Sequence, residues 1–294
     1  FWGNRSRRSA GRWRSRDERM KISVLMPAFN AEMFLREAVD SILNQTFGDF
    51  EFVIVDDCST DATRQILEEY AGRDSRVKLF RNEVNRGIAA TRNRLMAEAS
   101  PESDYFALMD ADDIALPERF EKQLEYLEAH PELAAAGSSI WIIDEESRRI
   151  GRRDYPSDPR RITAAMIRFN PISQSSVMIR RSAVKATGLY NPKYRAASDY
   201  DYWLRMQSRC SMANLPEPLM LYRISTTQCK RTNLKRTILV TLELQRRYLF
   251  SRRFFSPSAV VSHLAKYPLL LLPSGLIFRL FQRLAYKPAD SPRK

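Results

Sequence analysis

The chain has 294 residues, which suits one large domain or one domain with an appendage, because single hydrophobic cores stop growing near this size. Hydrophobic residues make up 44% and charged residues 28% of the sequence, which is ordinary for a globular protein. Cys58, Cys210 and Cys229 stand far apart without metal-binding or disulfide spacing, which excludes a cysteine-based zinc site or a disulfide framework and favours a reducing, cytosolic setting.

The net charge of +13 is unevenly distributed along the chain. Residues 1–19 carry seven Arg against two acidic residues, and residues 228–294 carry fourteen Lys or Arg against two. The middle, residues 20–227, is mildly acidic, with 27 basic and 31 acidic residues. We interpret the acidic middle as a body that acts on a metal-bound ligand. We interpret the basic flanks as segments that bind a polyanion, and we favour an anionic lipid leaflet over nucleic acid.

Residues 1–19 are rich in Arg and Ser and lack the apolar segment of a signal peptide. We expect a disordered basic extension there, with the natural start at Met20. The following sequence alternates predicted strands with predicted helices, which indicates βαβ units and a mainly parallel sheet covered by helices on both faces. The predicted strands are 22–26, 50–55, 77–80 and 104–109, and the predicted helices are 31–44, 62–71, 88–99 and one that Pro117 opens and that runs through Leu127.

Beyond Leu133 the alternation loosens, and we expect a second half grafted onto the sheet. Its predicted elements are a helix at 158–169, a strand at 175–179, a helix at 199–208 and a strand at 219–224.

The C-terminal part, residues 228–294, is predicted to be a helical, basic tail. A helix is expected at 234–253, and the apolar run at 267–278 contains two Pro and one Gly and is flanked by basic residues. That run is too short to span a bilayer. Two interpretations stay open, a segment lying in the membrane interface and a hairpin packed on the domain.

A cluster of acidic residues, Asp110, Asp112 and Asp113, follows the apolar run of the fourth predicted strand. Like charges this close repel one another unless a cation or another ligand offsets them. Carboxylate oxygens suit Mg²⁺ or Mn²⁺, which usually complete their ligand shell with substrate phosphates. The alternative for Asp113 is a helix cap. Ligands bind at the carboxyl ends of the strands in open α/β sheets, which is where this cluster lies.

Polar residues also end the first two strands. Pro27 and Asn30 follow the first strand, and Asp56, Asp57 and Asp61 follow the second. Capping of the next helix explains one of those three acids but not all of them. A carboxylate at a strand end can accept a hydrogen bond from a pyrimidine base or a ribose hydroxyl.

Two helix starts carry further candidates. Gly87 and Arg92 lie at the start of a predicted helix. Backbone N–H groups and a guanidinium group at such a position can bind a diphosphate. The alternative is an ordinary helix start with surface arginines. Asp199 and Asp201 begin a helix among Tyr and Trp, which suits a cap or a general base.

Taken in order, the motifs PAFN, VDDCSTD, NRGI with TRN, MDADD with PER, and SDYDYW resemble the family 2 inverting glycosyltransferases of the GT-A fold, over about residues 20–225. The resemblance implies an α/β, Rossmann-like three-layer sandwich, a nucleotide-sugar donor, most often a UDP-sugar, and a divalent metal, Mg²⁺ or Mn²⁺, at an Asp-x-Asp motif. It divides residues 20–227 into a nucleotide-binding half at 20–115 and an acceptor half at 116–227.

The resemblance also implies residue roles. Asp199 would be the catalytic base, which removes the acceptor's hydroxyl proton for a single displacement with inversion. Asp112 would ligate the metal, and Asp110 would face the ribose and the metal. The remaining implied donor contacts are Pro27, Phe29 and Asn30 around the nucleoside, Asp56 or Asp57 at the base, and Arg92 near the base and diphosphate.

Three positions depart from the family pattern. Ser198 stands where a Glu commonly precedes the base, Gln174 stands where many relatives carry His, and Ser225 replaces a His that would supply a third protein ligand to the metal. The base and the Asp-x-Asp motif are present in spite of these changes.

The sequence therefore predicts a metal-dependent, hexosyltransferase-like enzyme of bacterial cell-surface polysaccharide synthesis. We expect a saccharide or lipid-linked acceptor, a cytoplasmic location with peripheral attachment to the inner face of the membrane, and no nucleic acid partner. The alternative is a non-catalytic protein that binds nucleic acid or anionic membrane through its basic flanks, although no nucleic-acid-binding signature is present.

Overall fold

The structure is a computed structural model that describes residues 21–225 and 234–288. The predicted disordered extension at residues 1–19 lies outside the described residues, as do Cys229 and the chain ends of the predicted tail.

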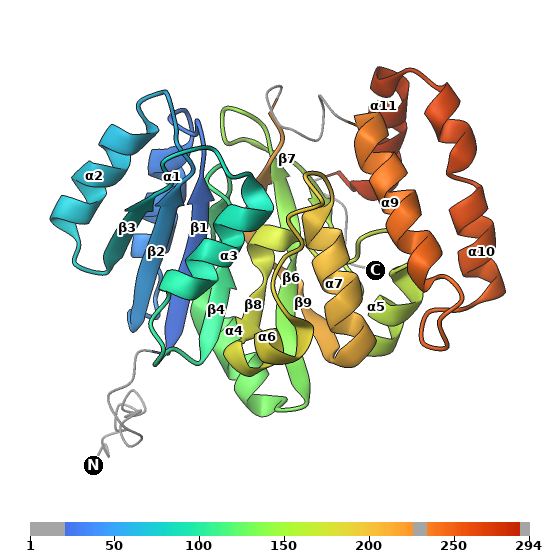
Figure 1. Ribbon diagram of the computed structural model, residues 1–294, viewed down its shortest axis with the longest axis horizontal. Coiled ribbons are helices and arrows are strands. Elements are labelled where there is room, and N and C mark those ends of the chain that lie inside the picture. The colour runs from blue at the N-terminus through green and yellow to red at the C-terminus, as the bar shows by residue number, and fades with distance from the viewer. Residues whose placement is uncertain (1–20, 226–233, 289–294) are drawn as a thin grey trace, which may run out of the picture.

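The described residues form one nine-stranded sheet with helices around it (Figure 1). The strands are β1 (Ile22–Ala28), β2 (Phe50–Asp56), β3 (Val77–Arg81), β4 (Tyr105–Leu108), β5 (Ile114–Ala115), β6 (Leu133–Ile143), β7 (Arg149–Arg153), β8 (Met178–Arg180) and β9 (Ser211–Arg223). The helices of the body are α1 (Leu35–Leu43), α2 (Thr63–Arg73), α3 (Ile88–Glu98), α4 (Arg119–Ala129), α5 (Pro159–Ala165), η1 (Gln174–Ser176), α6 (Arg181–Thr187) and α7 (Ser198–Arg209).

The first half of the sheet is a parallel block in the order β3-β2-β1-β4. β1, β2 and β4 are buried along their whole length, as expected for parallel strands covered on both faces. Alternate residues of these strands face two different cores: Val24 and Phe52 pack with α1 and α4, whereas Leu25 and Val53 pack with α3 and α7. This two-sided packing confirms the predicted α/β three-layer sandwich with a mainly parallel sheet.

The second half inserts an antiparallel strand beside β4. β8 runs antiparallel to β4, with Met178 opposite Ala107, so the residues that precede β8 lie at the carboxyl end of β4. β6 continues the sheet from β8 and pairs in parallel with β9, and β5 pairs antiparallel with the end of β9. β9 begins at Ser211, eight residues before the predicted strand, because Pro216 and Pro218 obscure the pattern where its pairing with β6 shifts register.

The C-terminal helices stand together at one end of the sheet, beside α7 (Figure 1). They are α9 (Leu234–Tyr248), α10 (Pro257–Leu264), η2 (Tyr267–Leu271) and α11 (Ser274–Ala285). Leu244, Leu249 and Phe254 join the core that contains α7, so this part of the tail is packed on the body. Within the described residues, no helix is long and apolar enough to cross a membrane.

Candidate active site

The carboxyl ends of β1, β2 and β4 meet at one edge of the sheet. Ala28 at the end of β1 pairs with Asp56 at the end of β2, and the Asp57 N–H donates to the Ala28 carbonyl oxygen at 2.8 Å. On the other side of β1, the Met109 N–H donates to the Leu25 carbonyl oxygen at 3.0 Å. The parallel register therefore brings the three polar strand ends predicted from the sequence to the same edge.

The loop after β1 is fastened to the loop after β2. Asn30 has a positive φ of 46°, which Asn tolerates better than most residues. Its side-chain oxygen accepts from the Thr60 N–H at 2.9 Å, and its backbone N–H donates to Ser59 Oγ at 3.0 Å. Phe29 is exposed, and Pro27 is buried next to Arg92. An exposed aromatic ring here is available to a planar ligand.

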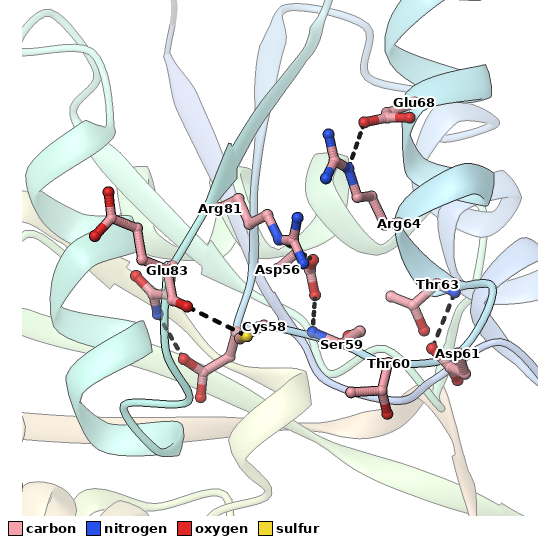
Figure 2. Close-up of polar contacts among 12 residues, drawn as sticks. Asp56, Cys58, Ser59, Thr60, Asp61, Thr63, Arg64, Glu68, Arg81 and Glu83 are labelled. Atoms are coloured by element: carbon pink, nitrogen blue, oxygen red, sulfur yellow. Dashed lines mark hydrogen bonds and ion pairs between the residues drawn. The ribbon is translucent and has the colours of Figure 1, made fainter.

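Asp56 and Asp57 are both buried, and each one organises a loop. Asp56 accepts from the Ser59 N–H at 3.0 Å, and its other oxygen forms an ion pair with Arg81 at 3.5 Å (Figure 2). Asp57 accepts from the N–H groups of Arg86 and Gly87, both at 2.9 Å, and from the Asn82 side chain at 2.6 Å. Asp57 thereby fixes the start of α3. Contact of either acid with a base stays a prediction.

A hollow of about 330 Å³ opens beside this pair of acids and is lined by Arg81, Asn82 and Glu83 at the end of β3. Cys58, which has a positive φ of 64°, donates from its thiol to the carbonyl oxygen of Glu83, one of the lining residues, at 3.4 Å (Figure 2). Asp61 accepts from the Thr63 N–H at 3.0 Å in the turn just before α2, whose N-cap is Ala62 and which has no side-chain cap.

Side chains from three elements hold the acidic loop at Asp110–Asp113. Arg92, on α3, forms an ion pair with Asp110 at 2.9 Å, and both groups are largely shielded from water. Ser175, in η1, donates its hydroxyl to Asp110 at 3.0 Å and also contacts Asp113. Arg223, at the end of β9, donates to the carbonyl oxygen of Asp112 at 3.0 Å. The loop is therefore positioned before any ligand binds.

Asp113 does not cap a helix, so that alternative was wrong. α4 begins at Arg119, and the residue before it is Glu118. Asp113 is buried and accepts from the Arg223 N–H at 3.0 Å. Burial raises the pKa of Asp113 well above its usual range, and the nearby charges of Asp112 and Asp110 raise it further. Its carboxyl group therefore links β9 to the loop after β4 and has no part in capping α4.

Arg92, Asp110 and Asp199 belong to one electrostatic group. Burial acts to lower the pKa of Arg92, but the charges of Asp110 and Asp199, together with the Tyr190 hydroxyl, raise it overall. The guanidinium group lies 5.6 Å from the centre of the Tyr190 ring. Asp199 is partly exposed in the first turn of α7, and one of its oxygens accepts from the Asn170 side chain at 3.1 Å. The charge of Asp199 therefore acts on the same arginine that pairs with Asp110.

Asp110 and Asp112 provide carboxylate oxygens on one short loop, the donor type that Mg²⁺ and Mn²⁺ prefer. Among the described residues there is no group of three or more His, Cys, Asp or Glu side chains placed to hold a metal. Such cations are commonly held by one or two carboxylates and complete their shell with substrate phosphates. The pair therefore fits a cation that arrives with a diphosphate, and Ser225 adds no imidazole ligand.

Several residues of this edge were not predicted from the sequence. Ser175, Tyr190, Asn170 and Arg223 come from segments that lie far along the chain from Asp110. Asn82 was missed although it carried a signal, since it is a polar residue that directly follows β3, as Asp57 directly follows β2. The others carry no local signal because the insertion of β8 beside β4 brings them to the site.

The fold is that of the GT-A glycosyltransferases, and comparison with known proteins agrees. The model of the glycosyl transferase family 2 matches residues 23–188, more than half of the chain. The chain belongs to this family, and it is a glycosyltransferase.

Individual relatives cover most of the chain. The putative glycosyltransferase EpsE of Bacillus subtilis is 32% identical, over 87% of this chain and 97% of its own length. An uncharacterized glycosyltransferase of Haemophilus influenzae is 35% identical over 70% of this chain, and the match spans 66% of that protein. The O-antigen biosynthesis glycosyltransferase WbnJ of Escherichia coli is 30% identical over 72% of this chain and 83% of its own length.

Among solved structures, Staphylococcus aureus TarS 1–349 in complex with UDP-GlcNAc is similar in fold, with a TM-score of 0.64 and 18% identity. The match covers 84% of this chain and 72% of that one. The likeness supports the GT-A fold predicted from the motifs.

Proposed function

We propose that this glycosyltransferase transfers a sugar from a UDP-sugar to a saccharide acceptor with inversion, using Asp199 as the base. The observation that supports the proposal is that the charge of Asp199, a partly exposed carboxylate, acts on Arg92, which is ion-paired with Asp110 at 2.9 Å. The complex of TarS with UDP-GlcNAc supports a uridine donor.

Each predicted donor residue has a role in this proposal. Phe29 and Asn30 would line the nucleoside, with Pro27 beneath them, and the loops held by Asp56 and Asp57 would form the wall around the base. Arg92 would share its charge between Asp110 and the diphosphate, since a guanidinium group has donors for both.

Asp110 and Asp112 would hold Mg²⁺ or Mn²⁺. The ion, when bound, supplies charge stabilisation to the departing diphosphate. The protein's own residues do the rest: Ser175 and Arg223 orient the acidic loop, and Asp199 takes the proton from the acceptor hydroxyl as the new glycosidic bond forms and the bond to the diphosphate breaks. Asn170 holds the Asp199 carboxylate in place through its side-chain amide.

The acceptor of the proposed reaction is a saccharide, free or lipid-linked, of the kind used in polysaccharide synthesis at the inner face of the cell membrane. The O-antigen biosynthesis relative supports a saccharide acceptor. This assignment of acceptor and location depends on likeness, so it is separate from the donor site itself.

The test is a calorimetric titration of UDP, with and without Mn²⁺, on the parent protein and on Asp112→Ala. Asp49→Ala is the matched control, because Asp49 is exposed before β2, at the opposite edge of the sheet from the acidic loop. We expect UDP to bind the parent and the control more tightly with Mn²⁺, and Asp112→Ala to lose that gain. The proposal would be refuted if UDP did not bind, or if its affinity depended neither on Mn²⁺ nor on the Asp112 substitution.

A further inference from the structure

The C-terminal helices expose far more apolar surface than the rest of the body. Of the eighteen large exposed apolar side chains among the described residues, eleven lie between Leu239 and Leu284. Leu271 and Leu284 are 86% and 87% exposed. Exposed apolar residues scattered singly are ordinary, but a concentration in one segment marks an interaction surface.

α11 arranges these residues on one side. Leu276, Leu280 and Leu284 follow one another at intervals of four, so they form a stripe along the helix, and all three are exposed. Arg279 and Arg283, also exposed, lie next to that stripe at the same spacing. We call these five residues the α11 face.

The side of α11 next to the leucine stripe, on the flank away from the arginines, contacts the body. Ile277 is buried, and the Phe281 ring lies 5.4 Å from the Arg153 guanidinium group of β7. Just beyond the helix, Lys287 exchanges backbone hydrogen bonds with Arg152 at 2.8 Å, and its ammonium group pairs with Asp154 at 2.7 Å. The orientation of the α11 face relative to the sheet is therefore set by the fold.

The charge of this region selects the partner. No Asp or Glu occurs from residue 244 to residue 288, whereas the same stretch contains eight Lys or Arg. A second copy of the chain would bring the α11 arginines of both copies together at the contact, with no acid from this stretch to offset them. A nucleic acid would leave the leucine stripe in water. An anionic bilayer offers charge for the arginines and an apolar layer for the leucines.

We propose that the α11 face docks the protein on an anionic lipid bilayer, with the leucine stripe inserted at the boundary of headgroups and acyl chains and the arginines on the headgroup phosphates. The docking stands independently of the proposed reaction.

Docking at this face also orients the active site. Lys266, between α10 and η2, donates to the Ile167 carbonyl oxygen at 3.3 Å and to Gln245 of α9 at 3.2 Å. Gln245 in turn donates to the hydroxyl of Tyr200, the residue after Asp199. The C-terminal helices therefore hold α7 by a buried polar contact, and a bilayer bound to α11 presents its surface at a fixed angle to the proposed base.

The experiment measures co-sedimentation of the full chain with vesicles of phosphatidylcholine alone and of phosphatidylcholine mixed with phosphatidylglycerol. We expect binding to the anionic vesicles only. Arg279→Gln/Arg283→Gln should lower the partition coefficient about 25-fold, from roughly a fivefold contribution of each arginine near the surface. Leu280→Gln/Leu284→Gln should lower it at least tenfold, from the apolar area withdrawn from the interface.

Arg64→Gln/Arg73→Gln is the matched control, because it removes the same charge from exposed positions on α2, at the far end of the sheet (Figure 1). It should change binding less than twofold. The proposal would be overturned if the α2 pair weakened vesicle binding as much as the α11 pair, or if the parent showed no preference for anionic vesicles. It would also be overturned if the parent formed a dimer that the leucine variant dissociates. Sugar transfer to a soluble acceptor without vesicles should be unchanged in the α11 variants, which separates docking from the proposed reaction.

Discussion

Replacement of Arg223 by Met tests how the acidic loop is held. Arg223 is fully buried, and its guanidinium group donates to the carbonyl oxygens of Asp112 and Asp144 at 3.0 Å and of Glu145 at 3.2 Å. It also lies 4.2 Å above the Phe34 ring of the α1 N-terminus. One side chain therefore joins the Asp-x-Asp loop, the β6–β7 turn and α1.

The expected loss of stability follows from these contacts. Met keeps most of the side-chain volume but donates no hydrogen bond, so three carbonyl oxygens lose a partner, at a net cost of about 1 kcal/mol each. The ion pair with Glu37 contributes little because Glu37 is half exposed. We expect the free energy of unfolding to fall by about 3 kcal/mol, which is within the range for a broken buried network.

Urea unfolding followed by tryptophan fluorescence measures this loss, and UDP affinity in the presence of Mn²⁺ measures the effect on the loop. Arg148→Met is the matched control, since Arg148 lies in the same β6–β7 turn and pairs with Asp144 but is 72% exposed. The control should unfold at the same urea concentration as the parent. Equal stability of Arg223→Met and Arg148→Met would refute the reasoning, and lost stability with unchanged UDP affinity would show that Arg223 supports the fold without positioning the acids.

Two further predictions concern Asp199 and Lys266. Asp199→Asn should lower kcat about 10²- to 10⁴-fold, because it removes the general base, while the affinity for the UDP-sugar stays within about twofold; a kcat equal to that of the parent would exclude Asp199 as the base. Burial lowers the pKa of Lys266 to about 8, so above that pH the folded protein binds fewer protons than the unfolded chain, and its stability rises with pH. Between about pH 7.5 and 9.5, below the ordinary ionisation of tyrosine, the free energy of unfolding should gain roughly 1 kcal/mol from this residue. Denaturant unfolding across that range checks the gain, and Lys266→Met should lack it; an unchanged slope in the variant would contradict the assignment.

The parallel block could be predicted from the sequence because its structure is encoded locally. Buried apolar strands of four to seven residues alternate with helices, and parallel register then places the strand ends at one edge. Asp57 and Asp110 were found by that rule alone. Their partners within the protein, the Gly87 N–H and Arg92, lie at the N-cap and in the first half of α3, which was found as a helix start.

The acceptor half was harder to predict because its order in the sheet depends on distant pairing. β8 lies between β4 and β6 although it follows both in the chain, and no periodicity indicates which neighbour a three-residue strand selects. Ser175 and Arg223 reach the site through this pairing. The sequence pattern also left open whether the apolar run at 267–278 packs on the domain or lies in the membrane interface. The structure has features of both, because the C-terminal helices pack on the body and also expose leucines.

If the acidic loop holds a metal and a nucleotide-sugar donor, as proposed, the charges around it favour binding of the two together. The pKa of Asp113 stays well above its usual range, because burial and the charges of Asp112 and Asp110 outweigh the hydrogen bonds from the Ser175 hydroxyl and the Arg223 backbone N–H. Burial in turn lowers the pKa of Arg119 to about 9, against the raising effect of Asp113 and Asp110. Asp110 already shares its charge with Arg92, so a cation alone gains little there, and a diphosphate alone meets repulsion from Asp112. In the proposed reaction the two ligands would offset each other's charge, and each would then raise the affinity for the other by the same factor.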